Sequence, residues 1–409
     1  MDVIVIGGGA SGMMAAITAA EKGAKVMLVE KNESMGRKLR ITGKGRCNVT
    51  NNCDVREVME NIPRNGRFLY SALSRFSPYD TMNFFEKLGV PLKTERGRRV
   101  FPVSDKAGDI ADALTRRLGE LNVNIVRGNA RSFIFEEGSC CGVNTFEDSF
   151  RAKSVILCTG GASYPKTGSD GFGYRLAQSA GHTIIPIQPS LVALTASDTW
   201  TGRAAGLTLK NAALKVMYDG KTIYEDFGEL AFTSDGLGGA VILSASANLP
   251  RCLEGHCVCV IDTKPALSRK QLDARILRDF NELRGGVFYD ALRKLLPKEL
   301  IEPVSALTGV PADKKISDMT KAERAALVDN LKALTVHIKD FRPIGEAVVT
   351  RGGVCVKEIS PKTMESKLCG GLYFAGEIID VDAYTGGFNL QIAFATGRTA
   401  GCSAAESNC

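Results

Sequence analysis

Three glycines and one acid near the start of the chain have the types and spacing of a nucleotide site. Gly7, Gly9 and Gly12 follow the apolar run 3–6 with the spacing GxGxxG, and Glu30 ends the next apolar run. The first glycine permits a tight turn, the second lets the backbone approach a pyrophosphate, and the third lets a helix pack on a strand. The acid accepts hydrogen bonds from ribose hydroxyls and would repel a 2′-phosphate. The pattern therefore predicts a dinucleotide site for a nucleotide other than NADP.

A basic stretch follows closely. Residues 36–52, GRKLRITGKGRCNVTNN, carry five basic residues and no acid in their first eleven positions. Basic side chains can neutralise a pyrophosphate, and bare glycine N–H groups can approach an electron-rich ring. A charge run alone is equally typical of a solvated face, so the glycine pattern before it decides the interpretation in favour of a ligand.

A strand, a helix and a second strand must position these residues. The run 3–6 is typical of a buried parallel strand, 10–22 has helical periodicity, and 25–30 is a second apolar strand. The glycines then lie at the helix N-terminus, where free N–H groups and a partial positive charge favour phosphates.

Composition narrows the class of protein. The chain has 409 residues, which suggests two or three domains, and 44% hydrophobic and 24% charged residues, as in ordinary globular proteins. Its net charge of +7 is mild, and no basic stripe with interleaved aromatics appears, so we expect anionic small molecules rather than nucleic acid as partners. Twelve scattered cysteines without CxxC and three distant histidines predict reduced thiols and no metal site. No signal peptide or membrane span is visible, so the expected location is the cytoplasm.

Three stretches resemble one family. They are 36–51, 157–174 (LCTGGASYPKTGSDGFGY) and 352–401, which contains GLYFAGEIIDVDAYTGGFNLQIAFATGRTAG. The chain resembles microbial NAD(FAD)-utilising dehydrogenases, a flavoprotein family typified by bile-acid 3-dehydro-Δ4,6-reductases and including aminoacetone-oxidase-like enzymes. The resemblance implies an α/β fold, with a Rossmann-like FAD-binding domain of the two-dinucleotide-fold type, and FAD as cofactor.

The resemblance assigns roles beside an FAD. The loop 42–48 would cradle the isoalloxazine ring, and 159–161 would touch the adenosine side. An acid after Gly376 would hold the ribityl chain; related enzymes usually have Asp directly there, whereas this chain has Glu377 and a further Asp380. The helix start at 387–389 would face the pyrimidine carbonyls. The expected cofactor-binding residues are Gly7, Gly9, Ala10, Ser11, Gly12, Glu30, Lys31, Arg37, Lys38, Thr42, Gly43, Gly45, Arg46, Cys47, Asn48, Ala130, Thr159, Gly160, Gly161, Gly376, Glu377, Asp380, Gly387, Phe388 and Asn389.

The FAD-binding domain is predicted to be split. Residues 1–190 form its N-terminal part, including a hairpin at 122–138 that places Ala130 near the adenine, and 342–409 form its C-terminal part. Residues 191–265 read as an inserted β-rich subdomain and 266–341 as an inserted helical one. The turn at 232–239, FTSDGLGG, departs from the family, whose members carry a Thr–His pair and a Gly-x-Ser-Gly-Pro turn.

Three functions stay open at this point. The first is hydride transfer through flavin N5 to a small apolar carbonyl-conjugated substrate, with NAD(P)H as the electron donor and a proton from Tyr164, Tyr384 or Asp235. The second is a dithiol–disulfide reductase using Cys47 and Cys53. Against it, five residues separate the cysteines where such enzymes have four, and no second nucleotide fold follows. The third is a non-catalytic flavin- or RNA-binding module. The sequence sets no oligomeric state.

Overall fold

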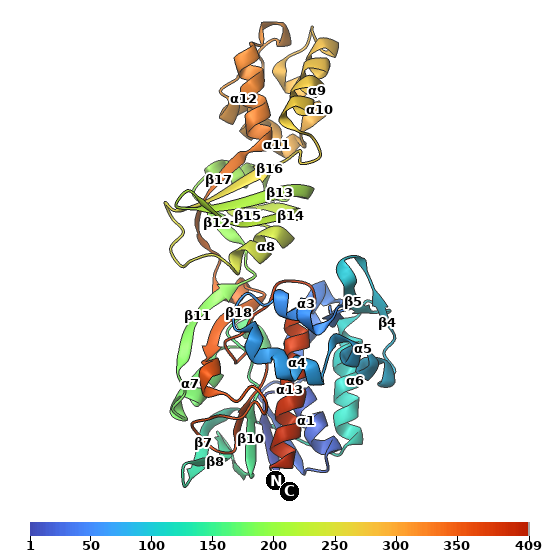
Figure 1. Ribbon diagram of the computed structural model, residues 1–409, viewed down its shortest axis with the longest axis vertical. Helices are drawn as coiled ribbons and strands as arrows, with labels where there is room; N and C mark the ends of the chain where they lie inside the picture. The colour runs from blue at the N-terminus through green and yellow to red at the C-terminus, as the bar shows by residue number, and fades with distance from the viewer. Residues whose placement is uncertain (408–409) are drawn as a thin grey trace. The chain divides into compact units, whose positions relative to one another are not determined.

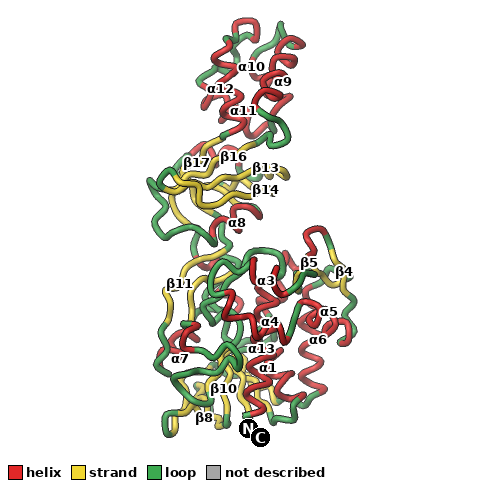
Figure 2. Tube along the Cα trace, viewed as in Figure 1, coloured by secondary structure: helices red, strands yellow, loops and turns green. Residues whose placement is uncertain are grey.

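The computed structural model describes residues 1–407, which fall into two compact units (Figures 1 and 2). Of these described residues, the first unit combines 1–190 with those from 344 onward, and the second spans 191–343. Each unit has its own buried apolar core. The first unit therefore contains both the blue and the red ends of the colour scale in Figure 1.

A five-stranded parallel sheet lies at the centre of the first unit. Its strand order is β19-β10-β1-β2-β6. Apolar residues fill both faces of β1 and β10, which is typical of a sheet covered on two sides. Because all four pairings are parallel, the carboxyl ends of the strands share one edge. The strands are β1 (Val3–Ile6), β2 (Val26–Glu30), β6 (Asn124–Arg127), β10 (Ser154–Leu157) and β19 (Leu372–Phe374).

Two helices from opposite ends of the chain pack closely in this unit. Helix α1 (Ala10–Glu21) follows β1, and α13 (Phe388–Glu406) is the last helix of the described chain. A Cβ atom at Gly397 of α13 would lie 2.3 Å from the Ser11 carbonyl oxygen of α1. The same distance, 2.3 Å, would separate a Cβ at Gly401 from the Ala15 carbonyl oxygen. These two glycines, four residues apart on one helix face, let the two backbones touch.

Shorter elements complete the first unit. Three small sheets have the orders β3-β5-β4, β7-β8-β9 and β11-β18. The helices are α2 (Arg37–Ile41), α3 (Val55–Glu60), α4 (Tyr70–Arg75), α5 (Pro78–Lys87), α6 (Ala107–Glu120) and α7 (Phe172–Ser179). The strands are β3 (Thr50–Asn51), β4 (Leu92–Thr94), β5 (Arg99–Pro102), β7 (Ala130–Glu136), β8 (Ser139–Thr145), β9 (Ser149–Arg151), β11 (Ile184–Ser190) and β18 (Val349–Val354).

The hairpin predicted at 122–138 is wrong. Its first half is β6, which pairs in parallel with β2, and its second half is β7, which pairs with β8 instead. The turn of the actual hairpin is at Glu137 and Gly138, both with positive φ. The two runs are adjacent in sequence, but the first of them, β6, pairs with β2 at the edge of the parallel sheet and so cannot pair with β7.

A closed barrel and a group of helices form the second unit. The barrel order is β12-β15-β14-β13-β16-β17, and α9 to α12 are inserted between β16 and β17. One apolar core includes residues of both parts. The elements are β12 (Leu194–Ala196), β13 (Thr208–Tyr218), β14 (Lys221–Thr233), β15 (Gly236–Gly238), α8 (Ala240–Ser246), β16 (Cys257–Asp262), α9 (Arg269–Glu282), α10 (Phe288–Leu295), α11 (Lys298–Thr308), α12 (Lys321–Lys332) and β17 (Leu334–Phe341).

Two elements of this unit differ from the sequence prediction. Helix α8 lies inside the segment predicted to be β-rich, and β17 ends the segment predicted to be helical. In β17, Leu334, Val336 and Ile338 are buried at alternate positions, so this strand completes the barrel.

The unusual turn at 232–239 is part of the barrel. A Cβ at Gly236 would lie 2.1 Å from the Leu194 carbonyl oxygen, and one at Gly239 would lie 2.7 Å from the Glu229 carbonyl oxygen. These two glycines therefore allow the close approach of β12 and β14 to this segment.

Replacing Gly401 with alanine should destabilise the protein. The new methyl group would meet the α1 backbone, which cannot move aside cheaply, so we expect a loss of about 1–3 kcal/mol. Gly119→Ala in α6 is the matched control, because nothing lies within 4 Å of the added Cβ. It should leave stability unchanged or raise it by about 0.5–1 kcal/mol. Urea unfolding of both variants measures the difference, and equal stability would contradict the close helix contact.

Candidate functional site

The glycine-rich turn joins β1 to α1 with the expected stereochemistry. Gly7 has a φ of +102°, which favours glycine. A Cβ at Gly12 would lie 1.8 Å from the Gly7 carbonyl oxygen, whereas a Cβ at Gly9 would meet nothing within 4 Å. The first turn of α1 has no side-chain cap and no acidic residue. The first N–H groups of α1, at Ala10 and Ser11, thus have no side-chain cap, and the space beside Gly9 is open, an arrangement suited to an anion.

Glu30 ends β2 beside this turn. One carboxylate oxygen accepts a hydrogen bond from the Gly8 N–H at 2.6 Å. The other accepts from the Asn32 backbone N–H at 2.7 Å and its side-chain amide at 2.6 Å. The carboxylate is buried and fixed at the strand end, where the ribose of a nucleotide would reach it.

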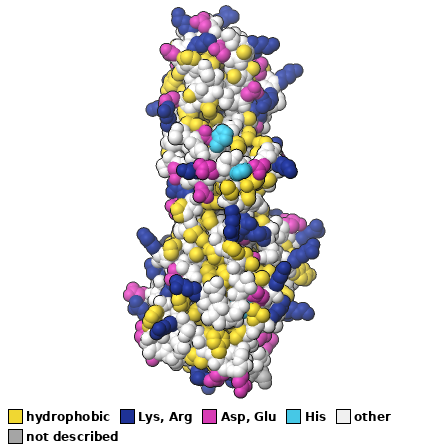
Figure 3. Space-filling model, turned by 90° about the vertical axis from the view of Figure 1, so that its left-hand side faces the viewer, with side chains coloured by type: hydrophobic (Ala, Val, Ile, Leu, Met, Phe, Trp, Pro, Cys, Tyr) yellow, Lys and Arg dark blue, Asp and Glu magenta, His cyan; other side chains and the backbone are white. Residues whose placement is uncertain are grey.

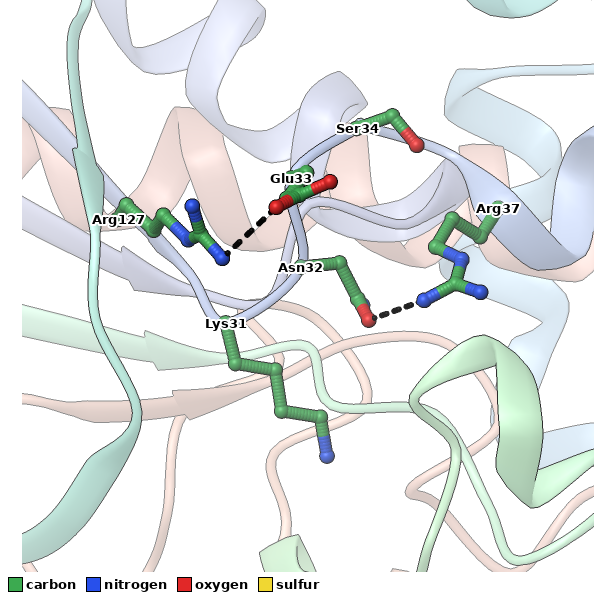
Figure 4. A pocket seen from close by; sticks show the side chains of 6 residues that line it. All are labelled: Lys31, Asn32, Glu33, Ser34, Arg37 and Arg127. Atoms are coloured by element: carbon green, nitrogen blue, oxygen red, sulfur yellow. Dashed lines mark hydrogen bonds and ion pairs between the residues drawn. The ribbon is translucent and has the colours of Figure 1, made fainter.

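A polar cavity of about 430 Å³ opens next to this acid (Figure 4). Arg37 donates to the Asn32 side-chain oxygen at 2.9 Å, and Arg127 pairs with Glu33 at 3.2 Å. Lys31 pairs with Asp170 at 2.7 Å. Three cations thus surround a cavity at the carboxyl end of β2. Its lining residues are Lys31, Asn32, Glu33, Ser34, Arg37 and Arg127.

Lys38 is placed differently from its neighbour Arg37. Its ammonium group donates to Glu377 at 2.7 Å and to the Ser163 hydroxyl at 2.5 Å. Glu377 also accepts hydrogen bonds from Ser163 and from the Thr350 N–H. Burial alone would raise the pKa of Glu377, but Lys38 and these hydrogen bonds outweigh it and lower the pKa. Lys38 and Glu377 are therefore an ionised pair within a hydrogen-bonded network, and this network joins the N-terminal and C-terminal parts of the first unit.

No sequence pattern marks Ser163 and Thr350 as members of this network. Their partners lie 214 and 27 residues away along the chain. Lys38 was predicted beside a pyrophosphate, and its ammonium group instead holds the acid that follows β19.

Several residues of the loop 42–48 have left-handed backbone conformations. Gly43, Lys44 and Cys47 have positive φ values of 57–58°. Gly45 has open space where a Cβ would stand, and the side-chain oxygen of Asn48 is buried without a partner. This oxygen and the open backbone beside it can take a ligand that donates and accepts hydrogen bonds.

Arg46 and Cys47 do not extend this surface as predicted. The Arg46 guanidinium lies 4.2 Å from the centre of the Phe101 ring and pairs with Asp105 at 2.6 Å. The Cys47 side chain is fully buried in the apolar core. Burial raises the pKa of the Cys47 thiol to about 12 and that of Cys53 to about 11, so both are poor thiolate nucleophiles.

The segment after β19 carries the remaining predicted residues Gly376, Asp380 and Asn389. Gly376 has a φ of +80°, and its added Cβ would lie 2.4 Å from the Ser11 hydroxyl oxygen. Asp380 accepts from the Asn65 amide at 3.0 Å, and burial raises the pKa of Asp380. Asn389 folds back on Ala383 through two hydrogen bonds.

Gly387 and Phe388 complete this segment at the start of α13. Gly387 packs against the backbone of Thr50: a Cβ added at Gly387 would lie 2.4 Å from the Thr50 carbonyl oxygen. The neighbouring Phe388 is buried. Thr159, Gly160 and Gly161 follow β10 at the same sheet edge, and the Thr159 hydroxyl is buried without a partner.

Ala130 is buried at the start of β7, one strand connection beyond β6. Overall, the strand ends bring together the glycine turn, Glu30, the segment at 159–161 and the acids after β19. These residues can hold a flavin dinucleotide: open backbone at Gly9, an acid for the ribose, and an orphaned oxygen at Asn48.

The candidate proton donors lie in different surroundings. Tyr164 is 37% exposed, and Tyr384 donates its backbone N–H to the Asn61 carbonyl. Asp235 belongs to the second unit, where it accepts from Arg342 and from Thr233 at 3.1 Å. The hydrogen bond from Arg342 lowers the pKa of Asp235, which makes this acid a poor proton donor at neutral pH.

Within residues 1–407, no three or more His, Cys, Asp or Glu side chains gather to hold a metal ion. None of the helices in that range has the length and apolarity to cross a membrane.

The chain is similar over its whole length to known proteins. It is 33% identical over 409 residues to the 3-dehydro-bile acid delta(4,6)-reductase of Clostridium scindens, covering 98% of both chains. It is 28% identical over 397 residues to the ribosomal RNA dihydrouridine synthase of Escherichia coli, covering 97% of this chain and 96% of the relative.

Solved structures share the fold. A 3-ketosteroid Δ1-dehydrogenase from Sterolibacterium denitrificans has a TM-score of 0.53 at 14% identity, with 99% of each chain covered. A 3-ketosteroid Δ4-(5α)-dehydrogenase from Rhodococcus jostii RHA1 has a TM-score of 0.51 at 16% identity, with 99% of this chain and 96% of that chain covered.

These similarities confirm the resemblance seen in the sequence, the Rossmann-like FAD-binding fold class, FAD as the cofactor and the oxidoreductase class. A family model described as HI0933-like protein Rossmann domain matches residues 1–403. The chain therefore belongs to the HI0933-like family of Rossmann-domain proteins.

Proposed function

We propose that this chain reduces a carbon–carbon double bond conjugated to a carbonyl group, using FAD and an NAD(P)H electron donor. The observation that carries the proposal is the full-length similarity, at 33% identity, to a reductase named for such a bond in a 3-dehydro-bile acid. Bound FAD, once reduced by a hydride from NAD(P)H, would supply a hydride from N5 to the carbon β to the carbonyl. The protein would supply binding, orientation and a proton.

The residues at the sheet edge divide these tasks. The N-terminus of α1 and Arg37 would hold the pyrophosphate, and Glu30 the ribose. Glu377, ionised beside Lys38, would accept hydrogen bonds from the ribityl hydroxyls. The loop 42–48 and the start of α13 would direct N–H groups at the ring, where they favour its reduced form.

Asp380 joins Tyr164 and Tyr384 as a candidate proton donor for the carbon α to the carbonyl. Its pKa is raised by burial, so it keeps a proton to higher pH than an exposed aspartic acid. Glu377, three residues earlier, has its pKa lowered. Two neighbouring acids with opposite shifts suit two different roles, one structural and one in proton transfer.

The electron donor would dock without its own Rossmann domain. Within residues 1–407, the second glycine-rich stretch, 168–173, follows the 3₁₀ turn Pro165–Thr167 rather than a strand. This supports NAD(P)H meeting the flavin directly rather than binding in a second dinucleotide fold.

A uracil base in RNA is the second candidate substrate. Relatives from Escherichia coli and Haemophilus influenzae, 28% and 29% identical, are named ribosomal RNA dihydrouridine synthases. The double bond that they saturate in uracil is also conjugated to a carbonyl, so one chemistry covers both candidates. The expectation that nucleic acid is no partner therefore stays a prediction.

Gly9→Val should abolish FAD binding. The isopropyl group would fill the open space beside the α1 N-terminus, where the pyrophosphate must approach, while the fold is kept. We expect a colourless protein with an unchanged far-ultraviolet circular dichroism spectrum. A folded Gly9→Val protein with one FAD per chain would contradict the assignment of this turn.

An enone should reoxidise the reduced enzyme. The test reduces the FAD-loaded protein anaerobically and mixes it with 4-androstene-3,17-dione, a quinone, an α-amino ketone and uridine-containing RNA. Prompt reoxidation by the enone or the RNA supports the proposal. Reoxidation by oxygen or disulfides alone would refute it.

Replacing Cys47 and Cys53 together with serine separates this function from the dithiol–disulfide alternative. The double variant should keep enone-dependent reoxidation, because burial raises the pKa of both thiols and leaves them protonated and unreactive. A loss of turnover that is restricted to disulfide substrates would favour the alternative.

A further inference from the structure

The positive charge of the chain is concentrated in one segment. Residues 37–106 contain 15 Lys or Arg and 7 Asp or Glu, a net charge of +8, whereas the whole chain carries +7. The rest of the chain is therefore close to neutral. The face of the molecule in Figure 3 shows basic and acidic side chains side by side. The segment 37–106 lies wholly within the first unit.

The turn between β4 and β5 exposes arginines from this segment. Arg96, Arg98 and Arg99 are all exposed. Arg98 pairs with Glu57 at 2.5 Å. Among the residues that the structure describes, no carboxylate forms an ion pair with Arg96 or Arg99, nor with the exposed Lys44 of the loop 42–48. Three cations are thus left with their charge uncompensated by protein.

This turn lies beside the loops proposed to hold the flavin ring. The Asn51 side-chain nitrogen donates to the Gly97 carbonyl at 3.0 Å and to the Gly386 carbonyl at 3.1 Å. A single amide therefore joins the tip of the arginine turn to the glycines before α13. On the other side, an added Cβ at Gly43 would lie 3.5 Å from the Phe101 ring, and Arg99 lies 5.8 Å from the centre of that ring.

We propose that Lys44, Arg96 and Arg99 form a phosphate-binding rim at the flavin site. The rim would hold the phosphate groups of the molecule whose reactive ring meets the flavin. Arginine forks match phosphate oxygens two at a time, and uncompensated cations release no protein partner when they bind. The inference rests on the proposed function, since the rim borders a flavin only if the loops 42–48 and 386–389 hold one.

Two molecules carry the required phosphates: the pyrophosphate of NAD(P)H and the backbone of an RNA strand. The affinity for a single strand falls with salt, and the salt slope is the decrease in log K per unit increase in log salt concentration. Each neutralised phosphate adds about 0.7 to this slope, so three cations would add about 2. For the nicotinamide donor, the same cations would lower the dissociation constant without any Rossmann fold of its own.

The experiment uses the FAD-loaded protein and the triple variant K44Q/R96Q/R99Q. Binding of a fluorescent oligouridylate is measured by anisotropy over a series of KCl concentrations. In a second arm, NADPH and NADH are mixed anaerobically with the enzyme, and the concentration dependence of flavin reduction is recorded by stopped flow. We expect at least one arm to weaken about tenfold or more in the variant, with a salt slope smaller by about 2 if RNA is the ligand.

The matched control removes three exposed cations of the same unit that lie outside 37–106, in the variant K25Q/R131Q/K362Q. It changes the net charge equally and should bind both ligands as the unmodified protein does. Weakening in the RNA arm identifies a strand as the ligand, and weakening in the nicotinamide arm identifies the donor. If the two triple variants behave alike in both arms, the rim is refuted.

The proposed function is tested separately by the uncharged 4-androstene-3,17-dione. Its reoxidation of the photoreduced flavin needs no phosphate contact, so the double variant R96Q/R99Q, which leaves the loop 42–48 unchanged, should keep it. If the unmodified enzyme lacks this reaction and the reaction with RNA, the proposed function fails. In that case the anisotropy measurement still tests the rim, because oligouridylate binding does not require any reaction at the flavin.

Discussion

The parallel pairing of β10 with β19 is the constraint on which the candidate site depends. It places residues 372–374 in register with 155–157, beside the sheet that begins at Val3. The carboxyl ends of β1, β2, β10 and β19 then share one edge, which is where ligands bind in open α/β sheets. Without β19 the edge would lack Glu377, and Lys38 would lose the partner that it holds at 2.7 Å.

The same constraint explains why a long segment can be inserted. The chain leaves the first unit after β11 and re-enters it before β18, and these two strands pair antiparallel. The ends of the insertion are thus held side by side by the first unit itself. The barrel and helices between them close around their own apolar core.

Local features of the site could be predicted from the sequence, and long-range ones could not. The roles of Gly7 and Gly12 follow from a turn and a helix contact within a dozen residues, and the structure reproduces both. The pairing of Lys38 with Glu377 spans 339 residues, so no local pattern encodes it. Arg46 was misplaced because a basic residue in a ligand loop can equally pair with nearby acids, here Asp105.

Strand assignments failed for a related reason. The residues of β6 fit a hairpin and a parallel edge equally well, and only the presence of β2 decides between them. In β17, the alternation of Leu334, Val336 and Ile338 is typical of a strand. Because four helices precede it in sequence, no local pattern indicates that it pairs with β16 in the barrel.

The central claim is that both ends of the chain build one site for FAD. Its most direct measurement is the identity and stoichiometry of the cofactor released by heat from the purified protein. Chromatography with mass detection should find one FAD per chain, without covalent attachment, because the α1 N-terminus and Glu30 require a pyrophosphate and a ribose. Recovery of FMN alone, or failure of the cofactor-free protein to take up added FAD, would contradict it.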